Sequence, residues 1–117
     1  MDTEHKHQAA LFRWAEIQSK RIPKLSLLFA IPNGGLRSKA TAAKLKAEGV
    51  KAGVPDICLP VAKGEYHGLF IELKTGGNKP TPPQVQWHMR LSSEGYRVTV
   101  CWGWEAAREA IEEYLLV

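Results

Sequence analysis

Two short apolar runs near the middle of the chain constrain the fold most. Residues 56–62 read DICLPVA and residues 69–74 read LFIELK, and the link between them, KGEYHG, contains two glycines. Runs of this length joined by such a link predict a β-hairpin. Pro60 cannot donate a sheet hydrogen bond, so the first strand should be short, bulged or at an edge there. The chain is therefore expected to contain a sheet with at least one antiparallel pair.

Helices are expected around this hairpin. Thr81, followed by two prolines and Gln84, has the pattern of a capping box and predicts a helix that continues to Gly95. The other expected elements are a helix over residues 3–20, a strand over 25–31, a helix over 38–49, a strand over 96–102 and a helix over 104–116. The predicted fold class is α/β, with a mixed four-stranded sheet flanked by helices in one domain, residues 1–117.

Composition and charge narrow the class of protein. The chain has 117 residues, 44% apolar and 24% charged, which is ordinary for a globular domain. Cys58 and Cys101 lie in β-like runs, where buried reduced thiols are expected. The polar N-terminus lacks a signal-peptide pattern and no apolar run is long enough to span a membrane, so a cytoplasmic protein is expected.

The positive charge is concentrated in one segment. Residues 37–51 contain five basic residues and one acid, Glu48, and therefore carry the whole net charge of +4. Such a segment is typical of a polyanion contact or of a solvated helix face. The expected DNA-binding residues are Asn33, Gly34, Gly35, Arg37, Lys39, Lys44 and Lys46, where the glycines would let backbone amides approach phosphates.

Three charged residues of the predicted hairpin form a candidate metal site. Side chains alternate along a strand, so Glu72 and Lys74 share one face, roughly 7 Å apart. If the turn is centred near Glu65, Asp56 lies opposite Lys74 and diagonal to Glu72. Two close carboxylates suit a hard cation, Mg²⁺ or Mn²⁺, and the lysine could orient or activate a water or stabilise charge on a phosphate. Phosphodiester hydrolysis fits this arrangement.

A structural interpretation of the same residues stays open at this point. Glu72 and Lys74 could be a same-face ion pair, and Asp56 could be a turn residue after Pro55. A one-residue slip of the hairpin would turn Asp56 to the opposite face of the sheet.

Longer motifs add a family resemblance. GVPDI and FIELK resemble the PD-(D/E)xK nuclease superfamily, and within it the chain resembles the standalone, often phage-borne, VRR-NUC family. The resemblance includes Glu4 with Gln8 on the first helix, PNGG after the first strand, and Gln84 with Trp87 before Gly95 and Tyr96. These motifs occur in order over nearly the whole chain.

The resemblance implies an αβββαβ core and a metal-dependent nuclease site. By motif position, Asp56 and Glu72 would bind the metal with their carboxylates, and Leu73 with its backbone carbonyl. Lys74 would position or activate the hydrolytic water. Glu4 would complete the acidic cluster and Gln84 would support it.

The resemblance also implies a substrate and an assembly. Short family members resemble archaeal Holliday junction resolvases in fold, so a structure-specific endonuclease acting on four-way junctions is the first expectation. Two symmetric cuts would require a homodimer. Bacterial or phage-encoded origin is implied as well.

Several side chains keep two interpretations. His5, His7 and His88 could bind a metal, but solvated histidines are more usual at such positions. Trp14, Trp87, Trp102 and Trp104 could include a base-stacking platform, but core or dimer contacts are more usual.

Three functional hypotheses remain. The first is the metal-dependent junction endonuclease. The second is a non-catalytic module that binds branched DNA and recruits DNA repair proteins. The third is a flap or restriction-type nuclease, or an enzyme acting on another phosphate ester.

Overall fold

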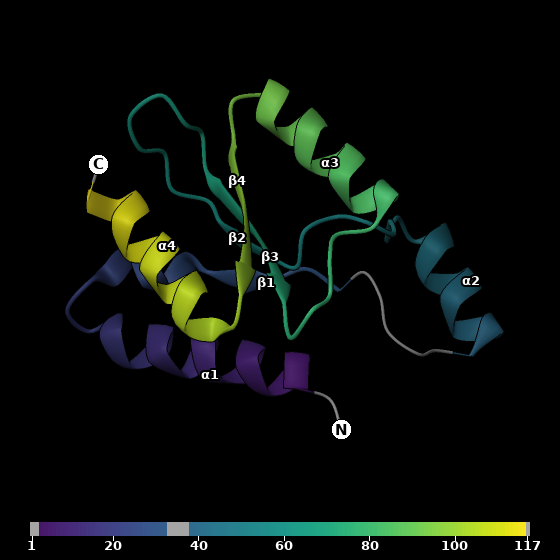
Figure 1. Ribbon diagram of the computed structural model, residues 1–117, viewed down its shortest axis with the longest axis horizontal. Coiled ribbons are helices and arrows are strands. Elements are labelled where there is room, and N and C mark those ends of the chain that lie inside the picture. The colour runs from purple at the N-terminus through teal and green to yellow at the C-terminus, as the bar shows by residue number, and fades with distance from the viewer. Residues whose placement is uncertain (1–2, 33–37, 117) are drawn as a thin grey trace.

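A computed structural model describes residues 3–32 and 38–116 (Figure 1). Its helices and strands follow the order expected from the sequence. This part of the chain contains four α-helices and a four-stranded mixed sheet, so the predicted α/β fold is confirmed. The elements are α1 (Thr3–Gln18), the 3-10 helix η1 (Pro23–Leu27), β1 (Phe29–Ala30), α2 (Lys39–Ala47), β2 (Ile57–Leu59), β3 (Leu69–Lys74), α3 (Pro82–Ser93), β4 (Arg97–Trp102) and α4 (Trp104–Leu116).

The strand expected over residues 25–31 is reduced to Phe29–Ala30, and residues 25–27 belong to a 3-10 helix, which corrects that prediction. Pro23 occupies the start of η1, where its fixed φ favours a helical turn and its missing N–H is not needed. Leu25 is buried from this turn, and only Phe29 and Ala30 pair with β2.

The sheet has the order β1-β2-β3-β4. β2 is antiparallel to both β1 and β3, and β4 is parallel to β3, as a crossover through α3 requires. The hairpin register pairs Ile57 with Ile71 and Leu59 with Leu69. Continued by one residue, this register sets Asp56 opposite Glu72. The predicted pairing of Asp56 with Lys74 is therefore wrong, although Asp56 keeps its predicted face.

The hairpin turn explains the shift in register. A tight turn pairs Lys63 with Tyr66. Three residues then separate Leu59 from Lys63, and two separate Tyr66 from Leu69. The extra residue falls around Pro60, directly after the end of β2, so the prediction of a short strand there is confirmed.

The two faces of the sheet have different partners. α1 and α4 cover one face, α3 lies against the other, and α2 stands apart from the sheet (Figure 1). Leu69, Ile71 and Leu73 of β3 point to the α1 and α4 side and are almost fully buried. The alternate residues of β3, including Glu72 and Lys74, point to the α3 side. The hydrophobic core thus leaves the α3 face of the sheet available for polar side chains.

Two further findings concern the whole described region. Cys58 and Cys101 are buried free thiols, as expected. No helix in residues 3–32 and 38–116 is long and apolar enough to cross a membrane.

Candidate active site

Asp56 is held in place by main-chain contacts on both sides. Its carbonyl accepts a hydrogen bond from the N–H of Ile31 at 2.7 Å, and its Oδ2 accepts one from the N–H of Leu73 at 2.8 Å. The carboxylate therefore takes the place of a sheet hydrogen bond beyond the end of β2. The N–H and C=O of one strand residue point to the same neighbour, so the Leu73 carbonyl faces the same side as Asp56.

The loop before Asp56 packs tightly on α3, and Gly53 makes this possible. Gly53 has φ +93°, and a Cβ at this position would lie 3.0 Å from Cδ1 of Trp87 and 3.1 Å from main-chain atoms of Pro83. Only glycine suits both the conformation and the space. The GVPD segment is thereby fixed against the first turns of α3, with Pro55 fully buried.

Glu72 is the most buried charged residue of the described chain, with 1% of its surface exposed. Nε2 of Gln84 donates to Oε2 of Glu72 at 3.3 Å, and Nε2 of His88 forms a 3.2 Å hydrogen bond with Oε1. Burial, a side-chain hydrogen bond with Asp56 and the charge of Asp56 raise the pKa of Glu72 to about 9, and Lys74 opposes this rise. A neutral Glu72 is therefore favoured until a cation compensates its charge.

The start of α3 orients the Gln84 side chain. The hydroxyl of Thr81 accepts a hydrogen bond from the N–H of Gln84, and Oε1 of Gln84 accepts one from the N–H of Thr81 at 2.8 Å, which confirms the predicted capping box. Because this bond fixes the amide oxygen, the amide nitrogen is directed at Glu72. One side chain thus caps the helix and supports the carboxylate.

Lys74 completes the cluster on the same face of β3. Only 9% of the residue is exposed, and its carbonyl accepts a hydrogen bond from Gly103, which ties the end of β3 to the end of β4. Burial and the positive charge of Lys74 lower the pKa of His88. His88 therefore tends to be neutral beside the ammonium group.

Glu4 approaches the cluster from the first turn of α1. It is half-buried, and its charge contributes to the raised pKa of Glu72. His7, one turn later, accepts a 2.9 Å hydrogen bond at Nδ1 from the N–H of Trp104 at the start of α4. This bond fixes α1 beside the ends of β3 and β4, so His7 is a structural residue.

His88 and His7 are the residues that sequence reasoning missed. Both were expected to be solvated, but His88 is 13% exposed and bonded to Glu72. A signal for His88 was present, because it follows Gln84 by four residues and so lies on the same face of α3. No local signal identifies His7, whose partner is far away in the sequence.

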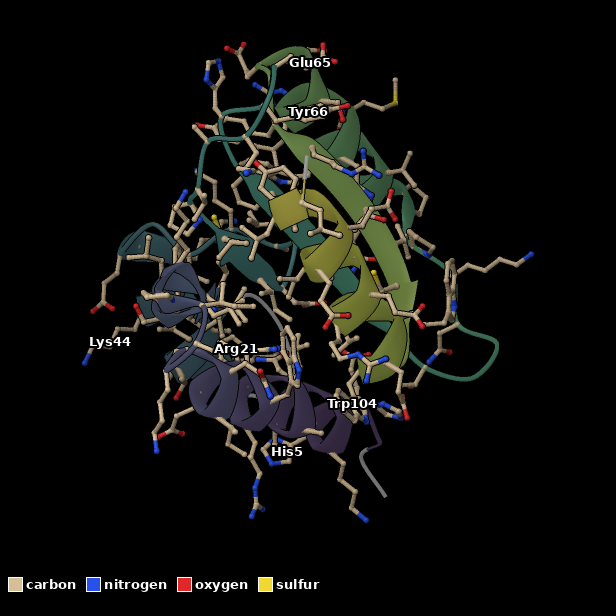
Figure 2. All side chains as sticks on the ribbon, turned by 90° about the vertical axis from the view of Figure 1, so that its left-hand side faces the viewer. His5, Arg21, Lys44, Glu65, Tyr66 and Trp104 are labelled. Carbon is tan, nitrogen blue, oxygen red and sulfur yellow. The ribbon has the colours of Figure 1, made fainter. Side chains whose placement is uncertain are left out.

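The expected DNA-binding residues lie on and before α2. Lys39, Lys44 and Lys46 are exposed, and Figure 2 shows Lys44 projecting from the body of the protein. Asn33, Gly34, Gly35 and Arg37 lie outside the described residues.

The donor set determines which metal these residues could hold. No group of three or more His, Cys, Asp and Glu side chains that could hold a metal occurs in residues 3–32 and 38–116. The oxygens of Asp56, Glu72 and the Leu73 carbonyl are hard ligands, and Mg²⁺ needs only one or two carboxylates because water and phosphate complete its octahedron. The set therefore fits Mg²⁺ or Mn²⁺.

The α/β fold and the cluster of Asp56, Glu72 and Lys74 are typical of one class of protein. These are nuclease domains with carboxylates and a lysine at one rim of a mixed sheet. Residues 2–104 match the VRR-NUC domain, and the chain belongs to this family. VRR-NUC nucleases are generally metal-dependent.

Individual relatives agree with this assignment. A solved structure described as a VRR_NUC domain protein superposes with a TM-score of 0.78 at 34% identity, covering 97% of this chain and 88% of the other. The chain is also 40% identical over 50 residues to "Putative nuclease p44" of Acyrthosiphon pisum secondary endosymbiont phage 1. That match covers 43% of this chain and about half, 52%, of the phage protein.

Proposed function

We propose that this protein is a Mg²⁺- or Mn²⁺-dependent, structure-specific DNA endonuclease that cuts branched DNA, with the four-way junction as its first substrate. The observation that carries the proposal is the adjacency of Asp56 and Glu72 on neighbouring strands, with Lys74 on the same face. A binding module has no need for a buried carboxylate with a pKa raised to about 9 next to a polyanion site. A simple ion pair would lower that pKa.

Each residue of the cluster has a proposed role. Asp56, Glu72 and the Leu73 carbonyl hold the cation, Gln84 and His88 orient Glu72, and Glu4 extends the acidic rim. A divalent cation held there would supply Lewis-acid chemistry, which polarises the scissile phosphate and promotes attack by water. The Lys74 ammonium group positions the water or stabilises the negative charge that develops on the phosphate.

The DNA path is proposed to cross α2. Lys39, Lys44 and Lys46 are available for phosphate contacts because none of them is buried in the domain. Asn33, Gly34, Gly35 and Arg37 are proposed to extend this surface. Phosphate contacts of this kind position the duplex but do not read its sequence.

A homodimer is proposed because a junction is cut on two strands. One domain carries one such cluster, so a two-fold pair would supply two. Leu27 and Phe29 are exposed at the free edge of β1 and offer an apolar surface for this contact. The phage relative supports a bacterial or phage-encoded protein acting in the cytoplasm.

The test is a panel of labelled substrates: a four-way junction, a flap and a linear duplex, each incubated with Mg²⁺ or with EDTA. We expect Mg²⁺-dependent cutting of the junction, no cutting in EDTA, and no cutting by Asp56→Ala. Cutting in EDTA, or undiminished cutting by Asp56→Ala, would exclude the mechanism. Binding without cutting would favour the non-catalytic DNA-binding module. Cuts at fixed sites in linear DNA would favour a restriction-type enzyme.

A further inference from the structure

Trp102 lies beside the proposed catalytic cluster. It is the last residue of β4, and the parallel register pairs it with Lys74. Strand neighbours lie about 4.8 Å apart, and paired residues point to the same face of a sheet. Cys101 points into the core with Leu73, so Trp102 points to the opposite face, the one that carries Glu72 and Lys74.

Trp102 differs from the other tryptophans in its surroundings. Trp14 and Trp104 pack against the hydrophobic core, and Trp87 packs on Gly53. Trp102 is 48% exposed, although tryptophan gains most from burial. Core packing therefore does not account for this residue.

The indole ring is nevertheless fixed in orientation. Its Nε1–H donates a 2.8 Å hydrogen bond to the carbonyl of Asn78, in the loop between β3 and α3. The N–H of Asn78 in turn donates to the Thr75 carbonyl at 3.2 Å, which closes a turn. The polar atom of the indole is thus satisfied by the protein, and the exposed part of the side chain is apolar ring surface.

The loop that holds the indole is open to a nucleic-acid backbone. A Cβ at Gly76 or Gly77 would have no heavy atom within 4 Å, so the space beside both glycines is free. Lys79 in the same loop is exposed and provides a positive charge. Trp102 therefore has Lys74 on one side and a basic, glycine-containing loop on the other.

We propose that Trp102 is a base-stacking subsite that receives one unpaired nucleobase next to the scissile phosphate. The inference rests on the proposed nuclease function and specifies its substrate, because a stacked duplex base cannot offer its face to the indole. DNA with an unpaired nucleotide at the cut, as at a branch point or flap, is therefore preferred over continuous duplex. The aromatic face accepts any base, so the subsite selects structure and not sequence.

The test compares Trp102→Leu and Trp102→Phe with the wild type in single-turnover cutting of branched DNA with Mg²⁺. Stacking on an aromatic ring is worth about 1 to 3 kcal/mol per base, so Trp102→Leu should raise the half-saturating protein concentration about 5- to 150-fold. Trp102→Phe keeps a ring and should recover most of this loss. Ile17→Ala, at a 59% exposed apolar residue on the far end of α1, is the matched control and should resemble the wild type.

A second arm identifies the stacked base. The nucleotides flanking the mapped cut are replaced, one at a time, by an abasic residue. One replacement should weaken wild-type cutting by the factor seen for Trp102→Leu, and should weaken Trp102→Leu no further. A merely structural role of Trp102 would give the same abasic penalty in both proteins.

The outcomes separate the two proposals. If the wild type cuts no DNA with Mg²⁺, or cuts in EDTA, the nuclease proposal fails and the subsite falls with it. If the wild type cuts but Trp102→Leu cuts equally well, only the subsite is refuted. A change in oligomeric mass with Trp102→Leu, and equal abasic penalties, would instead assign the ring to contact with a second copy of the chain.

Discussion

The buried Glu72 side chain gives the sharpest prediction, because its ionisation opposes folding when no metal is bound. The folded protein raises the pKa of Glu72 from 4.5 to about 9. A raised carboxyl pKa contributes stability that is complete below pH 4.5 and is lost as the pH rises toward 9. The loss is about 1.4 kcal/mol per pH unit, so it reaches about 3 kcal/mol at pH 7. That is a large part of the 5 to 15 kcal/mol typical of a domain.

Glu72→Gln isolates this effect, because the amide keeps the shape of the side chain and cannot ionise. In EDTA, the wild type should lose stability relative to Glu72→Gln as the pH rises. The difference between their free energies of unfolding should change by about 3 kcal/mol, in favour of Glu72→Gln, between pH 4.5 and pH 7. Urea unfolding at a series of pH values measures this difference. Glu109→Gln, at an exposed carboxylate on α4, should leave the pH profile of the wild type unchanged.

Metal addition provides the second half of the test. Mg²⁺ or Mn²⁺ should stabilise the wild type increasingly as the pH rises, because binding requires the carboxylate form. Glu72→Gln should gain little from either ion and should not cut DNA. Parallel pH profiles for the wild type and Glu72→Gln in EDTA would refute the reasoning.

Three further predictions concern the supports of the cluster and the DNA surface. Gln84→Glu preserves the capping box but replaces the amide that donates to Glu72. The rate of DNA cutting should therefore fall at least tenfold in a cleavage assay, with little loss of helix stability in thermal unfolding. Gly53→Ala should destabilise the protein by about 1 to 3 kcal/mol more than Gly49→Ala in urea unfolding. The two glycines have similar positive φ angles, +93° and +99°, but only at Gly53 is there no space for a Cβ. Lys44→Ala should weaken DNA binding and reduce the slope of log K against log salt by about 0.9, while leaving the cutting rate at saturation unchanged.

Local chemistry made much of this fold predictable. The capping box needs only residues 81–84, and the alternation that sets Glu72 and Lys74 on one face needs only one strand. The hairpin pattern brought Asp56 near Glu72, and the family motifs then implied that both carboxylates bind the metal. Helix capping and strand alternation depend on residues a few positions apart, so they can be predicted from a short stretch of sequence.

The errors arose where distant residues decide the outcome. The hairpin register depends on how the chain accommodates one extra residue around Pro60, and no local pattern fixes that position. The burial of His88 depends on α3 packing against the sheet, and the bond from Trp104 to His7 joins opposite ends of the chain. The error over residues 25–27 had a local cause instead, because the proline before this apolar segment imposes a helical turn.

Helix α3 links the two carboxylates of the cluster. Glu72 is held by Gln84 and His88 on one side of the helix, while the loop that carries Asp56 packs through Gly53 on Pro83 and Trp87. The separation of the carboxylates is therefore fixed by a single rigid element and not by their mutual repulsion. Such preorganisation keeps the two carboxyl groups adjacent, and the ionisation of Glu72 beside Asp56 then lowers stability at high pH. It follows that changes at the start of α3 should affect metal affinity more than DNA affinity, since Gln84 contacts Glu72 and the basic residues Lys39, Lys44 and Lys46 lie on a different helix, α2.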